Sequence, residues 1–272
     1  MPLKSRRLGR TGLVVSELGL GAMDTPHSPQ AFETITTAID LGIDFIDTAR
    51  DYEGSEMLLG QVIRERGQAG FHLASKTFKR TINGAQYEVD RSLAVLGVPQ
   101  ITLYQLHDVS TEAAWEAVMD VEHGALAGLE AARYRELVRF IGISSHNEDI
   151  LRRAILSREF DTVMLEYSAF FPHTAPLIDL AAEHDIGVIV MRPVGGSGRT
   201  STMRGMIERG EAGVLTPANL LRYVLSHPGV SVAIPGASYP SRVIENVRTA
   251  SDYAPMSERE KRDLEAAARD LY

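Results

Sequence analysis

Eight short apolar segments recur along the chain, and each is followed by a stretch with helical character. They span residues 18–23, 45–46, 71–74, 101–106, 140–143, 162–165, 188–191 and 232–234. Strands that alternate with helices pair in parallel, because a parallel connection needs a long crossover. Eight such units within about 250 residues predict a (β/α)8 TIM barrel, an α/β fold. An open doubly wound sheet is the alternative.

Local signals mark where several of the expected helices begin and end. Ser28-Pro29 and Thr216-Pro217 each combine an N-cap hydroxyl with a proline at the first helical position. Residues 257–260, Ser-Glu-Arg-Glu, have the spacing of a capping box. Gly42 and Gly97 stand where a helix commonly ends on a left-handed residue. These signals support the alternation of strands and helices.

The chain starts with a further expected element, a small N-terminal β-hairpin ahead of the first strand. Gly9 and Gly12, flanked by apolar residues, predict this hairpin, which would plug the barrel floor. No Gly/Ser linker, charge run or low-complexity tract divides the sequence. We therefore expect a single domain over residues 1–272.

Composition and charge exclude several classes of protein. No apolar run approaches the roughly 18 residues that a membrane helix needs, and the basic start has no apolar segment of a signal peptide behind it. Lys and Arg number 28 against 36 Asp and Glu, a net charge of −8, which weighs against nucleic acid and anionic membranes as partners. The absence of cysteine excludes disulfides and thiolate chemistry and fits a cytoplasmic location.

Common cofactor and catalytic motifs are missing. Gly19-Leu20-Gly21 begins like a dinucleotide fingerprint, but Asp24 occupies the position of the third glycine, so a Rossmann site is not predicted. P-loop, HExxH and GxSxG sequences are absent. The eight histidines are scattered singly, without the spacing of metal ligands, so no metal site is expected.

Four ionisable residues stand at or just beyond the ends of successive expected strands: Asp47, Tyr52, Lys76 and His107. Chemistry on a barrel sits at this C-terminal face, so these side chains would converge. A lysine ammonium about 4 Å from a tyrosine favours the phenolate by roughly 4 kcal/mol, or about 3 pKa units, and burial opposes this. Asp47 would keep Lys76 charged, and His107 would donate a hydrogen bond to a carbonyl oxygen. The set suggests carbonyl reduction with hydride from a cofactor.

The chain also resembles a known family, the aldo-keto reductases. The resemblance rests on five ordered motifs: residues 8–13 (LGRTGL), 15–21 (VSELGLG), 47–56 (DTARDYEGSE), 141–145 (IGISS) and 234–238 (IPGAS). It extends over essentially the whole chain. It implies that Asp47, Tyr52, Lys76 and His107 form the catalytic tetrad with Tyr52 as general acid. It also implies NADP(H) bound across the C-terminal face of a (β/α)8 barrel.

The resemblance implies a set of cofactor-binding positions as well. Ser144 and Ser145 match the residues that hold the nicotinamide carboxamide, while Met164 and Met191 stand where the family usually has a glutamine and an aromatic residue. The loop after the seventh strand would approach the pyrophosphate, and a further group would hold the adenosine phosphate, with Gly236 in place of the usual lysine. The remaining positions of the set are Gly21, Met23, Arg192, Pro193, Gly195, Ser238, Arg242, Glu245 and Asn246. Arg242 favours NADP(H) over NAD(H), because a guanidinium binds phosphate bidentately.

The resulting hypothesis is an NADP-dependent reductase of aldehydes or ketones, reversible as an alcohol dehydrogenase, with a small-molecule carbonyl or alcohol as substrate. Two alternatives stay open: a Schiff-base lyase that uses Lys76, and a non-catalytic nicotinamide-binding sensor or regulatory protein.

Specificity is expected from loops at residues 23–28, 78–84, 108–124 and 195–215 and from the C-terminal end. The glycine run at 195–198 is expected to be flexible. Trp115 either lines the pocket or caps the barrel rim, and His146 is expected to start a helix. Because the chain stops at Tyr272 directly after the last helix, an open site is expected.

Overall fold

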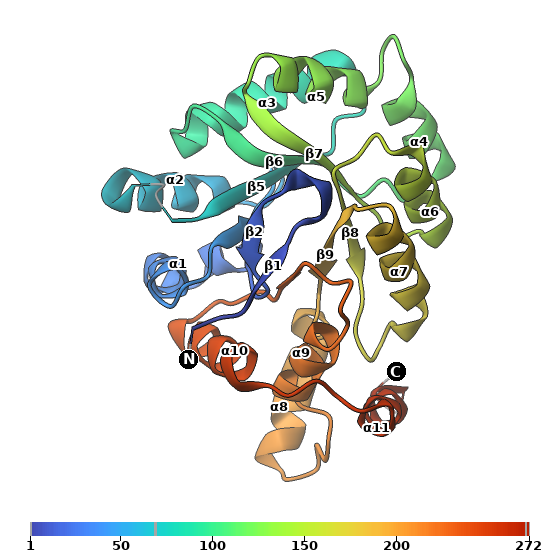
Figure 1. Ribbon diagram of the computed structural model, residues 1–272. Helices are drawn as coiled ribbons and strands as arrows, with labels where there is room; N and C mark the ends of the chain where they lie inside the picture. Colours follow the sequence, from blue (N-terminus) through green and yellow to red (C-terminus); the bar gives the residue numbers. More distant parts are fainter. Residues whose placement is uncertain (1, 68–69, 270, 272) are drawn as a thin grey trace.

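The computed structural model describes residues 2–67, 70–269 and 271, with the side chain of Ser197 left out. The expectation of an open site depended on Tyr272, which lies outside the described residues. Eight parallel strands form one sheet in which each strand pairs with the next in chain order (Figure 1). Bridges between Leu18 and Ala233 and between Gly21 and Gly236 join its two edges. The predicted barrel is therefore confirmed.

The strands fall where the apolar segments predicted them. Their bounds are β3 Leu20–Gly21, β4 Phe45–Asp47, β5 His72–Thr77, β6 Ile101–Leu106, β7 Val138–Ser144, β8 Thr162–Glu166, β9 Gly187–Met191 and β10 Val232–Ile234. Helices surround this sheet in Figure 1. They are α1 Ala31–Asp40, α2 Ser55–Arg66, α3 Ile82–Leu96, α4 Glu112–Met119, α5 Ala125–Tyr134, α6 Glu148–Ser157, α7 Ala175–Glu183, α8 Gly196–Glu208, α9 Pro217–Leu225, α10 Pro240–Asp252 and α11 Glu258–Arg269. Short 3-10 turns are η1 Gly9–Thr11, η2 Thr25–His27 and η3 Pro172–Thr174.

Most of the predicted helix ends are confirmed. The Thr216 hydroxyl accepts a hydrogen bond from the Asn219 amide at 3.2 Å, and Ser257 and Glu260 form the reciprocal capping box. Gly97 ends α3 with φ of 72°. The start of α1 was predicted too early, because the Ser28 hydroxyl accepts from the Gln30 amide within a separate turn.

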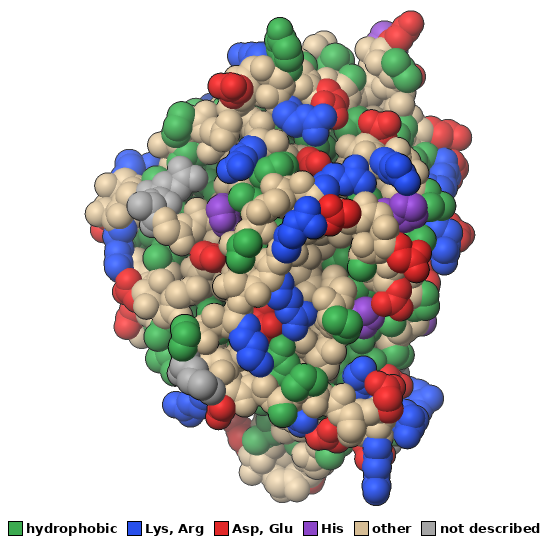
Figure 2. All heavy atoms as spheres, viewed as in Figure 1, with side chains coloured by type: hydrophobic (Ala, Val, Ile, Leu, Met, Phe, Trp, Pro, Cys, Tyr) green, Lys and Arg blue, Asp and Glu red, His purple; other side chains and the backbone are tan. Residues whose placement is uncertain are grey.

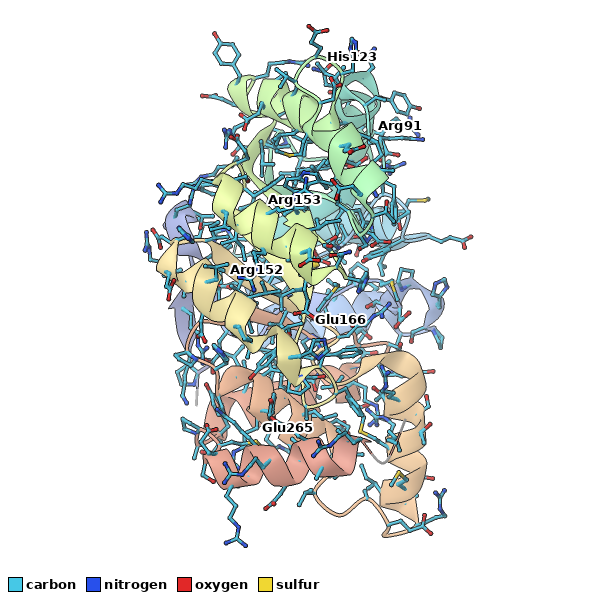
Figure 3. All side chains as sticks on the ribbon, turned by 90° about the vertical axis from the view of Figure 1, so that its right-hand side faces the viewer. Arg91, His123, Arg152, Arg153, Glu166 and Glu265 are labelled. Atoms are coloured by element: carbon cyan, nitrogen blue, oxygen red, sulfur yellow. The ribbon has the colours of Figure 1, made fainter. Side chains whose placement is uncertain are left out.

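One loop prediction was wrong, and one open alternative is decided. The glycine run at 195–198 is not a flexible loop: Gly195 is the N-cap of α8, and the helix begins at Gly196. Trp115 is buried within α4, against the guanidinium of Arg153, which lies 4.8 Å from its ring and is labelled in Figure 3. Trp115 does not line the large groove described below, so the alternative in which it lines a substrate pocket is wrong.

The predicted hairpin is present as β1 Ser5–Arg7 and β2 Val14–Ser16, which pair antiparallel. Leu8 and Leu13 from the turn and Val15 from β2 pack into a cluster with barrel residues such as Leu103 and Ile189. The hairpin therefore closes the N-terminal end of the barrel, as expected, and leaves the opposite end for a site. It lies on the face seen in Figure 2, where basic and acidic side chains are interspersed.

Gly9 lies directly against the barrel backbone, which makes it a test of the plug. A Cβ at Gly9 would lie 2.1 Å from the Gly187 backbone nitrogen, and its φ is +48°. Gly12 has φ of +70° but no atom within 4 Å of a Cβ. We expect Gly9→Ala to lower the free energy of unfolding by about 3 kcal/mol and Gly12→Ala by about 1 kcal/mol. Urea unfolding measures both, and equal losses would contradict the close packing.

Within the part of the chain that the structure describes, no helix is both long and apolar enough to cross a bilayer.

Candidate active site

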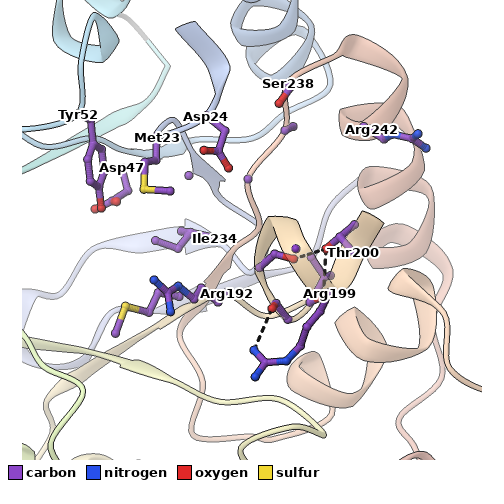
Figure 4. A pocket seen from close by; sticks show the side chains of 18 of the residues that line it. Met23, Asp24, Asp47, Tyr52, Arg192, Arg199, Thr200, Ile234, Ser238 and Arg242 are labelled. Atoms are coloured by element: carbon purple, nitrogen blue, oxygen red, sulfur yellow. Dashed lines mark hydrogen bonds between the residues drawn. The ribbon is translucent and has the colours of Figure 1, made fainter. Parts of the chain in front are cut away.

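A groove of about 800 Å³ opens at the C-terminal ends of the strands. In Figure 4, Asp47 and Tyr52 lie at one end and Ser238 and Arg242 lie toward the other, with Met23 and Asp24 between them and Arg192 below. All four segments expected to shape a substrate site contribute to its lining, with Asp24, Phe78, Asp108 and Gly195 among their residues. Of the residues predicted from the sequence, the groove is lined by Gly21, Met23, Asp47, Tyr52, His107, Ser144, Met164, Met191, Arg192, Gly195, Gly236, Ser238, Arg242 and Asn246.

Lys76 lies directly behind the groove wall and links two of the residues that line it. Its ammonium donates to Asp47 Oδ2 at 2.5 Å, to the Thr48 carbonyl at 2.9 Å and to Tyr52 Oη at 3.3 Å. An ammonium has three N–H donors, so each has a partner. Asp47 ends β4 and Lys76 lies in β5, the neighbouring strand, which explains how residues 29 positions apart meet. Lys76 is fully buried.

Asp47 has a second partner that the sequence analysis missed. Its Oδ1 accepts a hydrogen bond from Gln105 Nε2 at 3.1 Å. Gln105 lies in β6, two residues before His107, which directly follows the strand, and residues two apart along an extended segment share a face. That spacing was the available signal. Gln105 and Lys76 together hold the Asp47 carboxylate on both oxygens.

The electrostatic balance at Tyr52 is opposite to the prediction. Burial raises the pKa of Tyr52; Lys76 lowers it, but Asp47 adds to the rise, and the result lies above the ordinary value. Burial lowers the pKa of Lys76, but Asp47 and Tyr52 outweigh it, so the pKa lies above the usual range. Burial also raises the pKa of Asp47 against the charge of Lys76. The Lys76 ammonium is closer to Asp47 than to Tyr52, so its charge interacts mainly with the Asp47 carboxylate. Tyr52 keeps its proton beside an ammonium and can act as a proton donor.

His107 follows β6 and packs between groove residues. Its ring stacks on Phe78 with centroids 4.2 Å apart and meets Tyr52 edge-on at 5.5 Å. Its Nδ1 lies 2.9 Å from Asp51 Oδ1. Asp51 and Phe78 also line the groove, and both were missed. Their signal was sequence position, because Asp51 precedes Tyr52 and Phe78 follows Lys76 by two residues.

The two serines expected to hold a carboxamide have different surroundings. Ser144 lines the groove, and its hydroxyl accepts from the Asp108 amide at 2.9 Å. Ser145 does not line it; its hydroxyl accepts from the Asn147 amide at 3.0 Å. Asn147, not His146, is the N-cap of α6, which corrects the helix-start prediction.

His146 instead lines the groove beside a charged pair. Its Nδ1 lies 3.4 Å from Glu166 Oε1, which also accepts from Arg192 at 2.7 Å. Burial raises the pKa of Glu166, but His146 and Arg192 together hold it below its usual value. Glu166 therefore stays ionised and neutralises Arg192 at the groove wall.

The end of the groove away from Tyr52 combines two helix N-termini with arginines. Neither Gly195 before α8 nor Tyr239 before α10 provides a side-chain acceptor to the first turn, and both residues line the groove. The Arg242 guanidinium sits 3.0 Å from both carboxylate oxygens of Glu245, which is itself outside the lining. Helix N-termini and guanidinium groups attract phosphates. Pro193 is buried and does not line the groove.

Among the described residues, no group of three or more His, Asp or Glu side chains is arranged to hold a metal ion. The contacts described above give the groove proton-transfer groups at one end and anion-binding groups at the other.

Comparisons with a family model, with curated relatives and with solved structures all find aldo-keto reductases or oxidoreductases. A family model described as the Aldo/keto reductase family matches residues 17–268. The chain is 25% identical to the uncharacterized oxidoreductase YqkF of Bacillus subtilis over 92% of each chain. It is 30% identical to the aldo-keto reductase yakc [NADP(+)] of Schizosaccharomyces pombe over 56% of this chain and 48% of that protein. The holo form of aldo-keto reductase AKR11C1 from Bacillus halodurans shares the fold, with a TM-score of 0.79 at 23% identity over 99% of this chain and 96% of that one.

Proposed function

Since this chain belongs to the aldo/keto reductase family, a family of oxidoreductases, we propose that it is an NADP(H)-dependent enzyme that reduces aldehydes or ketones to alcohols and catalyses the reverse oxidation. One observation carries the proposal. The buried ammonium of Lys76 is bonded at once to Asp47 and to Tyr52 Oη, at the wall of a groove large enough for a cofactor and a small substrate.

The residues of the chain supply the proton chemistry. Tyr52, protonated at neutral pH, donates its proton to the substrate oxygen as the carbonyl is reduced. Lys76 then stabilises the phenolate that remains, since its ammonium already touches Tyr52 Oη. Asp47 keeps that ammonium charged, and His107 orients the substrate oxygen. When bound, NADP(H) supplies the hydride.

The groove fits a phosphate-bearing nucleotide at its far end. The N-termini of α8 and α10 would take the pyrophosphate and adenosine phosphate, with Gly195, Ser238, Arg242 and Asn246 contributing. Glu245 orients Arg242 from behind. The name of the S. pombe relative, which includes NADP(+), supports the preference for NADP(H) over NAD(H).

At the reactive end, Ser144, Met164 and Met191 line the groove beside Tyr52 and would hold the nicotinamide. Gly21 and Met23 complete that wall. Ser145 and Pro193 would act indirectly, by shaping the loops that follow β7 and β9.

Arg242 provides the test of cofactor choice. We expect Arg242→Ala to weaken NADPH binding by about tenfold and NADH binding by less than about twofold, because only NADPH carries the 2′-phosphate. Fluorescence titration measures both Kd values. Arg248→Ala removes the same charge from an exposed part of the same helix and serves as the control. An equal loss for both nucleotides would contradict a 2′-phosphate role for Arg242.

The function itself is tested by titration with NADPH and NADH, followed by absorbance-monitored turnover of a panel of aldehydes and ketones. Consumption of NADPH with any carbonyl supports the reductase. Binding without consumption across the panel favours the sensor alternative. Borohydride trapping of substrate on Lys76 would favour the lyase, against which the buried, charged state of Lys76 argues.

A further inference from the structure

Asp51 makes a contact that the proposed mechanism does not use. Its Oδ1 lies 2.9 Å from Nδ1 of His107, across 56 residues of sequence. The His107 side chain is 12% exposed, whereas Asp51 is 38% exposed at the groove wall. Phe78 and Tyr52 hold the ring from two other directions. The ring is thus fixed in plane by the stacking and in rotation by the carboxylate.

The contact determines which ring nitrogen carries hydrogen. Burial raises the pKa of Asp51, but the hydrogen bond and charge of His107 hold it below its ordinary value, so the carboxylate is ionised at neutral pH. An ionised carboxylate only accepts hydrogen bonds, so Nδ1 must be the donor. In a neutral imidazole the other nitrogen, Nε2, then has a lone pair and no hydrogen.

We infer that Asp51 is a positioning residue that holds His107 in the Nδ1–H form, so that neutral His107 presents an acceptor at Nε2 to the substrate. The effect of this positioning on turnover rests on the proposed function, whereas the tautomer itself does not. It revises the role expected from the sequence. Neutral His107 would accept a hydrogen bond from the hydroxyl of an alcohol, and only the charged ring would donate one to a carbonyl oxygen.

The tautomer can be measured directly. The protein carries 15N-labelled histidine and is examined with and without saturating NADP+ at about pH 9, above the ordinary histidine pKa of about 6.5. The His107 signals are assigned by their loss in His107→Gln. Two-bond 15N–1H correlation spectra distinguish Nδ1–H from Nε2–H. We expect Nδ1–H in the parent and in Asp51→Glu, and a shift toward Nε2–H in Asp51→Ala. Nε2–H in the parent, or no change in Asp51→Ala, would overturn the inference.

The kinetic arm tests whether this positioning matters for turnover. We expect Asp51→Ala to lower kcat/KM for alcohol oxidation about tenfold, because the variant loses the Nε2 acceptor for the alcohol hydroxyl, with Asp51→Glu recovering most of it and the Kd for NADPH unchanged. Glu53→Ala, which removes a carboxylate two residues away from an exposed position outside the groove lining, is the control and should leave kcat/KM unchanged. Unchanged kcat/KM in Asp51→Ala would overturn the positioning role. A parent inactive with every carbonyl would instead reject the proposed function, and the spectra would still decide the tautomer.

Discussion

Replacing Tyr52 with phenylalanine is expected to lower kcat for carbonyl reduction by about three orders of magnitude while leaving the Kd for NADPH within about twofold. The substitution removes one oxygen, which carries the proton proposed for transfer and the contact to Lys76. It leaves the ring that packs against His107. Because Tyr52 Oη is only one of three acceptors of the Lys76 ammonium, we expect the free energy of unfolding to fall by no more than about 1 kcal/mol.

Steady-state turnover and fluorescence titration of NADPH measure the two quantities separately. Tyr134→Phe removes the same hydroxyl from a tyrosine that is 91% exposed on α5 and should leave both unchanged. If Tyr52→Phe retained the parental kcat, Tyr52 would not be the general acid, and the proton would have to come from another groove residue. A large loss of NADPH binding would instead indicate a role in holding the cofactor.

Lys76→Met is expected to lower the free energy of unfolding by about 3–5 kcal/mol, in addition to abolishing turnover. The Lys76–Asp47 pair is buried on both sides. Without the ammonium, the Asp47 carboxylate keeps Gln105 as its side-chain partner among the described residues. A buried carboxylate with too few partners is costly. The pKa of Asp47 is already raised by burial in the parent and should rise further without Lys76. The difference from the parent should therefore widen as the pH rises above the raised pKa of the parent, because the penalty falls on the ionised form.

A double-mutant cycle with Asp47→Asn tests the same pair. The combined variant Asp47→Asn/Lys76→Met contains neither charge, so it should lose at least about 1 kcal/mol less than the two single losses added together. Denaturant unfolding gives these values without any need for activity, which all three variants are expected to lack. Additive losses would mean that the two side chains stabilise the barrel independently.

The barrel, the hairpin and the position of Lys76 could be predicted from the order of residues along the chain. The alternation of apolar segments and helices determined the barrel, since parallel strands require crossovers. Glycines at 9 and 12 predicted the hairpin, because only a tight turn with positive φ needs them there. The C-terminal ends of parallel strands face one side, so Asp47 and Lys76 had to approach each other. Each of these follows from backbone geometry and burial, which local sequence encodes.

Other features depended on which side chains meet across the barrel. The glycine run near Gly195 begins a helix because its tertiary surroundings outweigh a weak local propensity. The pKa of Tyr52 rose instead of falling, because packing buried the phenol and gave the nearer contact of Lys76 to Asp47. Asp51 reached His107 through the conformation of a loop. The sequence alone therefore determined the barrel and the residues at its mouth, whereas the tertiary structure decided their protonation and pairing. The physical reason is that desolvation and hydrogen bonding act over a few ångströms, and only the folded chain defines those distances.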